Sequence, residues 1–298
     1  MLFPISGVEV EPFVPFLVAL VVSFFTSMGG VSGAFLLLPF QVSFLGYTSP
    51  SVSATNQVFN VIAIPSGIYR YIKEGRMLWP LSKYIIIGTL PGVFIGAWIR
   101  IEYLLDPRHF KFFASIILAY IGFRLLLDVF KKSQHTTSKI TCLPENGNAL
   151  KIVKSSFREV QFIYAESVFS FVPLYILLLC FIVGILGGIY GIGGGSIIVP
   201  FLVTFFALPV YCIAGAALTG TFATSIAGVL FYHLLANYYP NINISPDWAL
   251  GGLFGLGGLI GMYLGARTQH LVPARAIKGI LCFCTIFVAG KYVLDFLR

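Results

Sequence analysis

Two glycine-rich strings are the parts of this 298-residue chain that are best suited to chemistry. One reads GIYGIGGGSIIVP at positions 188 to 200, and a related string, GGVSGAFLLLP, occupies positions 29 to 39. Unpaired N–H groups at the start of a helix attract anions, so a glycine-rich break before a helix could hold one. The string at 188 to 200 has no Gly-Lys-Ser/Thr ending and does not meet the Gly-x-Gly-x-x-Gly spacing of nucleotide loops. We therefore expect a small anion, rather than a nucleotide, at these breaks.

Polar side chains follow each string at helical spacing. Two asparagines lie four residues apart after the first string, and three hydroxyl residues share a helix face after the second. Amides and hydroxyls at membrane depth need a partner, and a neighbouring helix or a ligand would serve any one of them equally well. Their repetition beside both strings, with Asn60 and Thr221 at equivalent positions, favours a shared cavity. The candidate substrate-binding residues are Gly29, Gly30, Ser32, Gly33, Asn56, Gln57, Asn60, Gly191, Gly193, Gly194, Gly195, Ser196, Thr221, Thr224 and Ser225.

Close helix packing is the simpler explanation of the glycines, because small residues let helix backbones approach each other. The functional alternative is that each string breaks a helix, so that half-helices over 34 to 46 and 196 to 207 begin in a central cavity. An inverted pair of such helix starts would form a positive site without a buried lysine or arginine. Ser32 and Ser196 would add hydroxyl donors to it.

No set of side chains suggests catalysis or metal binding. The four histidines are widely spread and have no ligand spacing, and no Ser/His/Asp set stands out. Most cysteines lie inside apolar runs and are typical of small buried hydrophobic residues. The sequence therefore predicts no catalytic residue, no metal and no cofactor, and a protein that is not an enzyme.

The composition places these strings in a bilayer. Hydrophobic residues make up 58% of the chain and charged residues 10%, and the mean hydropathy is +0.92. Soluble domains carry about 25% charged residues, so the soluble class is excluded. A net charge of +8 would suggest nucleic acid in a soluble protein, but basic residues of membrane proteins collect in cytoplasmic loops. We expect an integral membrane protein in contact with lipid and without a nucleic-acid partner.

Apolar segments must contain roughly 20 residues to cross a hydrocarbon core of about 30 Å as a helix. The segments of suitable length are 52 to 70, 78 to 99, 111 to 130, 172 to 190, 210 to 236, 248 to 268 and 276 to 297. Three shorter segments, 13 to 28, 34 to 46 and 196 to 207, each adjoin a glycine cluster. Such half-length pieces are expected where a helix is broken near the membrane midplane. Full crossing and re-entry both stay open for the first two.

The two strings belong to a longer internal repeat. Glycine, aliphatic and Pro-Phe positions coincide between 29 to 40 and 190 to 201, and glycines at 88 to 97 match those at 257 to 266. Each half has five apolar segments, and an odd number of crossings places the halves in opposite orientations. The predicted fold is an all-α polytopic membrane protein of eight to ten membrane segments. It has two inverted repeats of about four to five helical segments each, with glycine-broken half-helices.

The repeat divides the chain into three parts. Residues 1–130 form an N-terminal transmembrane repeat, 131–171 a cytoplasmic connector and 172–298 a C-terminal transmembrane repeat. Within the connector, residues 151 to 164 partly alternate polar and apolar, which predicts a small hairpin or an amphipathic segment.

Loop charges predict the orientation. Basic residues gather at 70 to 76, in the connector and at 267 to 278, whereas the N-terminus is acidic and 237 to 247 contains no lysine or arginine. By the positive-inside rule, the connector is cytoplasmic and the N-terminus lies outside. We expect the protein itself in the cell inner (plasma) membrane. The loop that carries Arg100, Arg108 and Lys111 is an exception, because it falls on the outer side.

The chain resembles the sulfite exporter TauE/SafE family of membrane transporters, also called the toluene sulfonate uptake permease family. The resemblance is carried by GILGGIYGIGGGSIIVP at 184 to 200, by GGVSGAFLLLP at 29 to 39 and by the later GTLPGVFIGA and GLIGMYLGA stretches. It covers nearly the whole chain apart from the connector. Ser32 stands where the second string has Gly193. The resemblance implies transport of sulfur-containing anions such as sulfite, sulfoacetate or other organosulfonates.

Together, these features predict a secondary carrier for a small sulfur-containing anion, with a central site between the repeats. Access would alternate as one repeat moves against the other, coupled to protons or driven by the anion gradient and the membrane potential. An anion channel would share the site but needs a path open at both ends. A membrane enzyme subunit that handles sulfur compounds is a third alternative. The exact substrate, the direction of transport, the coupling ion and the oligomeric state stay open.

Overall fold

The chain folds into a bundle of helices with two small antiparallel sheets. The computed structural model describes residues 1–28, 31–130, 150–164, 167–268 and 274–297. The helices of these ranges are α1 (Phe13–Met28), α2 (Ala34–Ser43), α3 (Ser51–Lys73), α4 (Trp79–Glu102), α5 (Pro107–Phe130), α6 (Pro173–Tyr190), α7 (Gly194–Phe205), α8 (Val210–Leu235), α9 (Trp248–Thr268) and α10 (Ala274–Leu297). The mostly helical fold confirms the predicted class of polytopic α-helical membrane protein.

Within the described residues, four helices are long and apolar enough to cross a membrane, namely α4, α6, α9 and the Cys212–Leu235 part of α8. α3 has 23 residues, which is also a sufficient length, but its first three turns are rich in serine, threonine, asparagine and glutamine. These polar residues are buried. α3 is therefore a helix of the bundle interior that has a polar face.

Glycines with positive φ set the boundaries of the half-helices. Gly191 (φ +77°) follows the last residue of α6, and Gly193 (φ +74°) precedes the first residue of α7. Both φ angles lie in a region that favours glycine. α7 thus begins at Gly194, two residues before the predicted start. α2 ends at Ser43 rather than at residue 46, because Gly46 (φ +67°) lies in the following turn. At 1.5 Å per residue, a helix as short as α2 spans about 15 Å, half of a hydrocarbon core.

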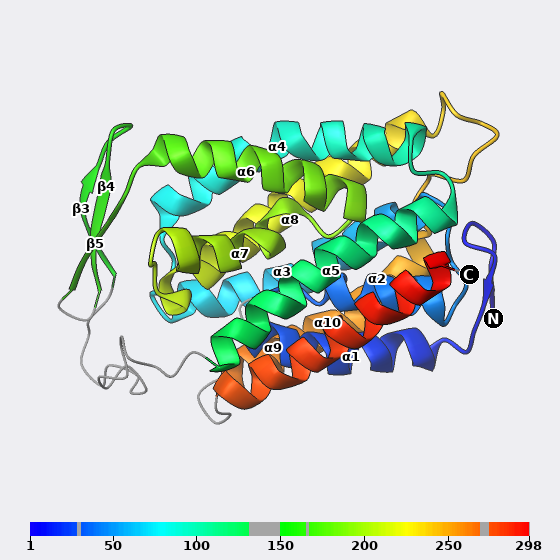
Figure 1. Ribbon diagram of the computed structural model, residues 1–298, viewed down its shortest axis with the longest axis horizontal. Coiled ribbons are helices and arrows are strands. Elements are labelled where there is room, and N and C mark those ends of the chain that lie inside the picture. The colour runs from blue at the N-terminus through cyan, green and yellow to red at the C-terminus, as the bar shows by residue number, and fades with distance from the viewer. Residues whose placement is uncertain (29–30, 131–149, 165–166, 269–273, 298) are drawn as a thin grey trace.

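The bundle has two distinct ends (Figure 1). At one end, β3 (Lys151–Ser155), β4 (Val160–Tyr164) and β5 (Ser167–Phe171) form an antiparallel sheet in the order β3-β4-β5. This sheet confirms the predicted hairpin and adds a third strand; connector residues 131–149 lie outside the described residues. We call this the sheet end.

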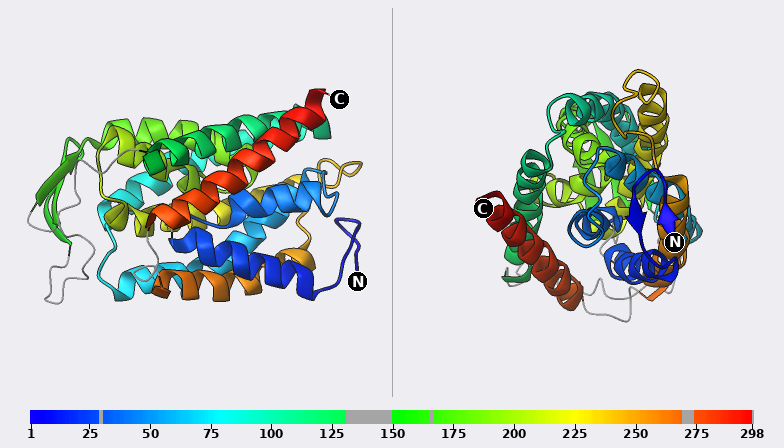
Figure 2. Two further views of the ribbon diagram at one scale, coloured as in Figure 1. Left: turned by 60° about the horizontal axis from the view of Figure 1, so that its bottom comes forward. Right: turned by 90° about the vertical axis from the view of Figure 1, so that its right-hand side faces the viewer.

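The opposite end, which we call the N-terminal end, holds the hairpin of β1 (Leu2–Phe3) and β2 (Val8–Glu9). The loop between α8 and α9 lies beside it, because the Asp247 carboxylate accepts a hydrogen bond from the Ser6 hydroxyl at 2.8 Å. The start of α3 is there too, since the Ser51 N–H donates to the Asn243 carbonyl at 3.0 Å. α1 therefore begins at the N-terminal end, and α2 ends there. Figure 2 shows this hairpin and the sheet at opposite ends of the molecule.

Helices from the two halves pair with each other in a regular way. α1 packs on α9 and α4 packs on α6, while α3 contacts α9 and α8 contacts α4. When α1 to α5 are replaced by α6 to α10 in order, and the reverse, the α1–α9 pair becomes the α6–α4 pair and the α3–α9 pair becomes the α8–α4 pair. α3 and α8, which correspond in this exchange, run antiparallel, because Gln57 lies opposite Gly228 and Gly67 lies opposite Leu218.

Rows of glycine let α4 pack closely on α6 and α9 pack closely on α1, and the helices of each pair run parallel. A Cβ atom added to Gly92 of α4 would lie 2.4 Å from the Phe181 carbonyl oxygen of α6. A Cβ atom added to Gly261 of α9 would lie 2.2 Å from the Leu20 carbonyl oxygen of α1. These distances leave room only for hydrogen, so backbone packs directly on backbone. The rows are Gly88, Gly92 and Gly96 on α4, and Gly257, Gly261 and Gly265 on α9.

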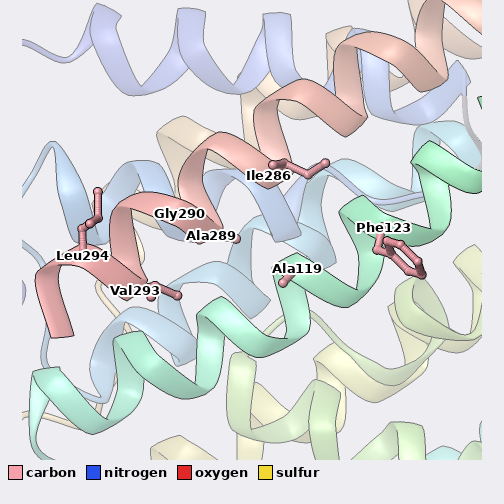
Figure 3. Close-up of a pocket in the computed structure, with 7 residues that line it drawn as sticks. All are labelled: Ala119, Phe123, Ile286, Ala289, Gly290, Val293 and Leu294. Carbon is pink, nitrogen blue, oxygen red and sulfur yellow. The ribbon is translucent and has the colours of Figure 1, made fainter. Parts of the chain in front are cut away.

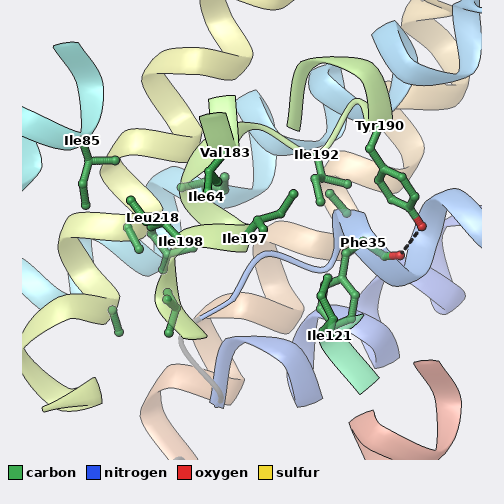
Figure 4. Packing of buried hydrophobic residues seen from close by; sticks show 14 of the residues in the cluster. Phe35, Ile64, Ile85, Ile121, Val183, Tyr190, Ile192, Ile197, Ile198 and Leu218 are labelled. Carbon is green, nitrogen blue, oxygen red and sulfur yellow. Dashed lines mark hydrogen bonds between the residues drawn. The ribbon is translucent and has the colours of Figure 1, made fainter. Parts of the chain in front are cut away.

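Buried hydrophobic side chains of both halves surround the glycine breaks (Figure 4). Ile197 and Ile198 of α7 lie near Ile64 of α3 in this cluster. The Tyr190 hydroxyl, at the end of α6, donates to the Phe35 carbonyl of α2 at 3.2 Å. The two broken segments therefore meet in the middle of the core.

Candidate functional site

Asn56 of α3 connects the starts of both broken segments. Its Nδ2 donates to the Ala34 carbonyl at 3.0 Å, where α2 begins, and to the Gly191 carbonyl at 3.2 Å, in the break before α7. Its Oδ1 accepts a hydrogen bond from Nε2 of Gln41 at 3.3 Å. One amide thus joins three segments of the chain.

Asn60, one turn further along α3, repeats this arrangement. Its Nδ2 donates to the Ile192 carbonyl and to the Ser225 hydroxyl of α8, both at 3.1 Å. Its Oδ1 accepts a hydrogen bond from the Ser32 hydroxyl, which also accepts the Ala34 N–H at 3.3 Å. Ser32 of the first half and Ser225 of the second half are therefore joined through Asn60.

Gln57 lies beside these two asparagines and is fully buried. Neither its Nε2 nor its Oε1 has a hydrogen-bond partner among the residues that the structure describes. The side chain lies against α8 at Gly228, where an added Cβ would approach Oε1 to 2.1 Å. Buried amides are nearly always hydrogen-bonded in native proteins, so this one calls for a partner.

The break before α7 lies against the hydroxyl face of α8. A Cβ atom on Gly193 would come within 2.9 Å of Thr221, 3.1 Å of Thr224 and 3.2 Å of Ser225. Gly193 precedes α7 without a side-chain cap, and the first N–H groups of a helix have no partner within the helix itself. Backbone donors and the hydroxyl face of α8 therefore adjoin each other.

The threonine hydroxyls of that face bond to their own helix. Thr221 donates to the Ala217 carbonyl at 3.0 Å, and Thr224 donates to the Gly220 carbonyl at 2.8 Å. Such bonds satisfy a hydroxyl in an apolar helix without any ligand. The protons of these two hydroxyls are therefore used within α8.

The structure thus brings together most of the candidate residues. We call the following set the central polar cluster: Ser32, Gly33, Asn56, Gln57, Asn60, Gly191, Gly193, Gly194, Gly195, Thr221, Thr224 and Ser225. Gly29 and Gly30 lie outside the described residues, as does the side chain of Ser196. The side chains of the seven polar members are all 0% exposed, so the cluster is closed to water at both ends.

Sequence reasoning missed two residues of this region and misplaced a third. Gln41 was the one amide in an otherwise apolar half-helix and could have been noticed; Tyr232, whose hydroxyl donates to Gly188 O at 3.4 Å, gave no signal. Arg100 was assigned to an outer loop, but α4 extends to Glu102 and buries Arg100 completely. Arg100 is thus a residue of the bundle interior rather than of the loop, although it is not a member of the central polar cluster.

Two surface hollows lie away from the cluster. The larger, about 590 Å³, is a groove between α5 and α10 lined only by apolar residues (Figure 3). The other, about 490 Å³, lies between the start of α4 and β3 and includes Lys83. The groove offers no donor to an anion, and neither hollow includes a member of the central polar cluster.

Comparison with known proteins places the chain in a family. The family model described as sulfite exporter TauE/SafE matches residues 15–292. The chain belongs to the sulfite exporter TauE/SafE family. The match covers all ten helices of the described residues except the first two positions of α1 and the end of α10, so both halves and the central polar cluster lie within it.

Curated relatives of the chain carry transporter names. A probable membrane transporter protein YunE of Bacillus subtilis is 24% identical over 276 residues, which cover 89% of this chain and 93% of the relative. A probable membrane transporter protein of Xylella fastidiosa is 23% identical, covering 91% of this chain and 92% of the relative. One from Haemophilus influenzae is 39% identical over 42% of this chain and 45% of its own. No solved structure matches this TauE/SafE chain.

Proposed function

We propose that this TauE/SafE protein is a secondary carrier that moves a small sulfur-containing anion, such as sulfite, sulfoacetate or another organosulfonate, across the cell membrane. The observation that carries the proposal is a closed polar cluster, bonded to both halves of the chain, in which the amide of Gln57 has no partner. Family membership supports a transporter, and the family description names sulfite.

The cluster suits an oxyanion because the donors that stay free in it are neutral. Sulfite and sulfonate groups offer three oxygens, each of which accepts hydrogen bonds. Nε2 of Gln57 supplies an unused side-chain donor, and the uncapped start of α7 supplies backbone N–H groups at the positive end of a helix dipole. A neutral site also releases its anion more readily than a pair of opposite charges would.

The closed state favours a carrier over a channel. All the polar side chains of the cluster are 0% exposed, so an anion must wait for a rearrangement before it enters or leaves. The antiparallel α3 and α8 and the exchanged helix pairs support two inverted repeats, which can open alternately to either side. An enzymatic role has no observation in its favour.

Purified protein in proteoliposomes tests the function directly. We expect saturable uptake of radiolabelled sulfite or sulfoacetate, with exchange against unlabelled anion on the other side. Sulfate, phosphate, taurine and a simple carboxylate serve as the comparison set. The same flux measured with and without a pH gradient, and at imposed membrane potentials, identifies the coupling.

Three outcomes would contradict the proposal. Large single-channel currents would make the protein a channel. Chemical conversion of sulfite without translocation would make it an enzyme. Saturable flux of phosphate or carboxylate, with none of sulfite or sulfoacetate, would retain a carrier but reject the sulfur-anion class.

A further inference from the structure

Arg100 is a fully buried positive charge at the N-terminal end of the molecule. It is 0% exposed, and its guanidinium lies 3.8 Å from the centroid of the Phe110 ring. It donates to the carbonyl oxygens of Leu104 and, at 3.2 Å, of Thr48. Its Nε is buried without a hydrogen-bond partner, and no carboxylate in the described ranges forms an ion pair with it.

The acidic residues nearest in the sequence are engaged elsewhere. The Glu102 carboxylate accepts a hydrogen bond from the Tyr239 hydroxyl at 3.2 Å. The Asp106 carboxylate accepts the backbone N–H of Arg108 at 2.8 Å. A buried charge without a counter-ion is costly, and inside a membrane protein it points to a function that needs it.

Aromatic rings connect Arg100 to the glycine break. Phe110, which lies under the guanidinium, has its ring centroid 6.4 Å from that of Tyr190. Tyr190 is the last residue of α6 and immediately precedes Gly191. Arg100 is therefore separated from the central polar cluster by two rings.

A second connection follows the interface of α3 and α8. Polar residues of α3 contact facing residues of α8, turn after turn, from the cluster toward the N-terminal end. The successive pairs are Asn60 with Ser225, Gln57 with Gly228, and Ser53 with Tyr232. Beyond the last pair, Ala97 and Ile101, on either side of Arg100 in α4, pack with Tyr232 and Ala54.

We propose that Arg100 is a second anion-binding position, which holds the substrate anion at the N-terminal end of the path to the central polar cluster. The inference rests on the proposed function. In the closed state, the carbonyls of Thr48 and Leu104 occupy two of the guanidinium nitrogens. In the state open to that end, oxygens of sulfite or a sulfonate replace these carbonyls and form a two-pronged, charge-assisted contact.

A purely structural role makes a different prediction. Arg100 also fastens the loop after α2 to the loop after α4, and a fastener would affect stability and both directions of transport alike. A binding position near one end affects the KM measured from that end only. The side of the membrane on which KM changes is therefore the readout that separates the two roles.

The experiment measures radiolabelled sulfite transport in right-side-out and in inverted membrane vesicles. We expect Arg100→Gln to raise the KM about tenfold for sulfite presented at the N-terminal end, and less than about twofold for the sheet end. Arg100→Lys keeps the charge but cannot form the two-pronged contact, so it should raise the KM at the N-terminal end by about threefold and leave the KM at the sheet end unchanged. Arg108→Gln removes an exposed charge from the neighbouring turn and is the matched control, with no change in either KM.

The outcomes separate this inference from the proposed function. If Arg100→Gln leaves the KM unchanged, or raises it equally from both sides, the inference is overturned. The proposed function still holds in that case, provided that the original chain transports sulfite. No sulfite transport by the unchanged chain overturns both. If Arg100→Gln fails to fold, Arg100→Lys decides between the two roles. A lowered melting temperature with an unchanged KM at the N-terminal end indicates a fastener. A retained melting temperature with a KM shift confined to that end supports binding.

Discussion

Neighbouring amides on α3 differ sharply in their surroundings. Asn60 makes three hydrogen bonds to other segments, whereas Gln57, three residues earlier on the same helix, makes none although it is equally buried. Removal of a partnered amide and removal of an unpartnered one have opposite effects on stability. Structural and functional contributions can therefore be separated within one turn of helix.

Replacement of the unpartnered amide should impair transport without harming the fold. We expect Gln57→Leu to leave the free energy of unfolding unchanged or to raise it by about 1 kcal/mol, because an unsatisfied buried amide disappears. Sulfite flux should fall at least about tenfold, since Nε2 is the free side-chain donor of the cluster. Thermal unfolding in detergent and flux in proteoliposomes measure the two effects. Gln161→Leu in β4 makes the same chemical change in the connector and, as the control, should leave flux intact. Normal flux by Gln57→Leu would exclude Gln57 from the site.

Replacement of the partnered amide should destabilise the protein. Asn60→Leu removes three hydrogen bonds between segments, each worth roughly 0.6 kcal/mol in a membrane protein, so we expect a loss of about 2 kcal/mol. Denaturation in a mixed detergent system gives the free energy of unfolding. A variant as stable as the original chain would show that this network does not hold the halves together.

At the scale of elements, the glycine rows determine which helices can touch. α4 lies on α6 and α9 lies on α1 with backbone atoms in direct contact, and in both pairs a glycine occupies every fourth position of the contact. Larger residues there would push the helix axes apart. The same packing is used once in each half, at corresponding positions.

One methyl group in either row should therefore be costly. We expect Gly92→Ala and Gly261→Ala each to lower the free energy of unfolding by about 1 to 3 kcal/mol, because the new Cβ would lie 2.4 Å and 2.2 Å from a carbonyl oxygen of the partner helix. Gly252→Ala, also on α9 but with nothing within 4 Å of its Cβ, is the matched control and should be neutral. Equal melting temperatures for Gly261→Ala and Gly252→Ala would contradict direct backbone packing.

The sequence predicted the elements much better than their contacts. Apolar length and the glycine clusters locate every helix to within a few residues, because membrane solvation acts on each segment separately. The sequence also matched Gly92 with Gly261, but it could not show that their partners are α6 and α1. The lack of a partner at Gln57 and the burial of Arg100 depend on how distant helices pack, and no local pattern encodes that.

At the scale of the whole molecule, basic residues gather at one end, with Arg100, Arg108 and Lys111 as the exception at the other. Arg70, Lys73 and Arg76 lie near the sheet end together with Lys151 and Lys154, whereas loop 237–247 at the N-terminal end has no lysine or arginine. By the positive-inside rule, the sheet end should face the cytoplasm. The proposed second anion position then faces the outside.

Labelling of single cysteines tests this orientation. In a chain whose five native cysteines are replaced, we expect Asn241→Cys to react with a membrane-impermeant maleimide on intact cells, because this exposed residue lies at the N-terminal end. Ser156→Cys, exposed beside the sheet, should react only after the cells are permeabilised. The reverse pattern would place the sheet outside, and labelling of both on intact cells would contradict a single orientation.

The packing of α1 on α9 has a consequence for biosynthesis. Phe16 and Gly257 are in direct contact but lie 241 residues apart in the chain. At about 5 to 20 residues per second, a ribosome needs roughly 12 to 48 seconds to make the segment between them. During that interval, the first helix has entered the membrane without the surface it will pack against, and the nascent N-terminal half cannot complete its own fold. The first helix to be made therefore reaches its main packing partner only after nearly the whole chain has been synthesised.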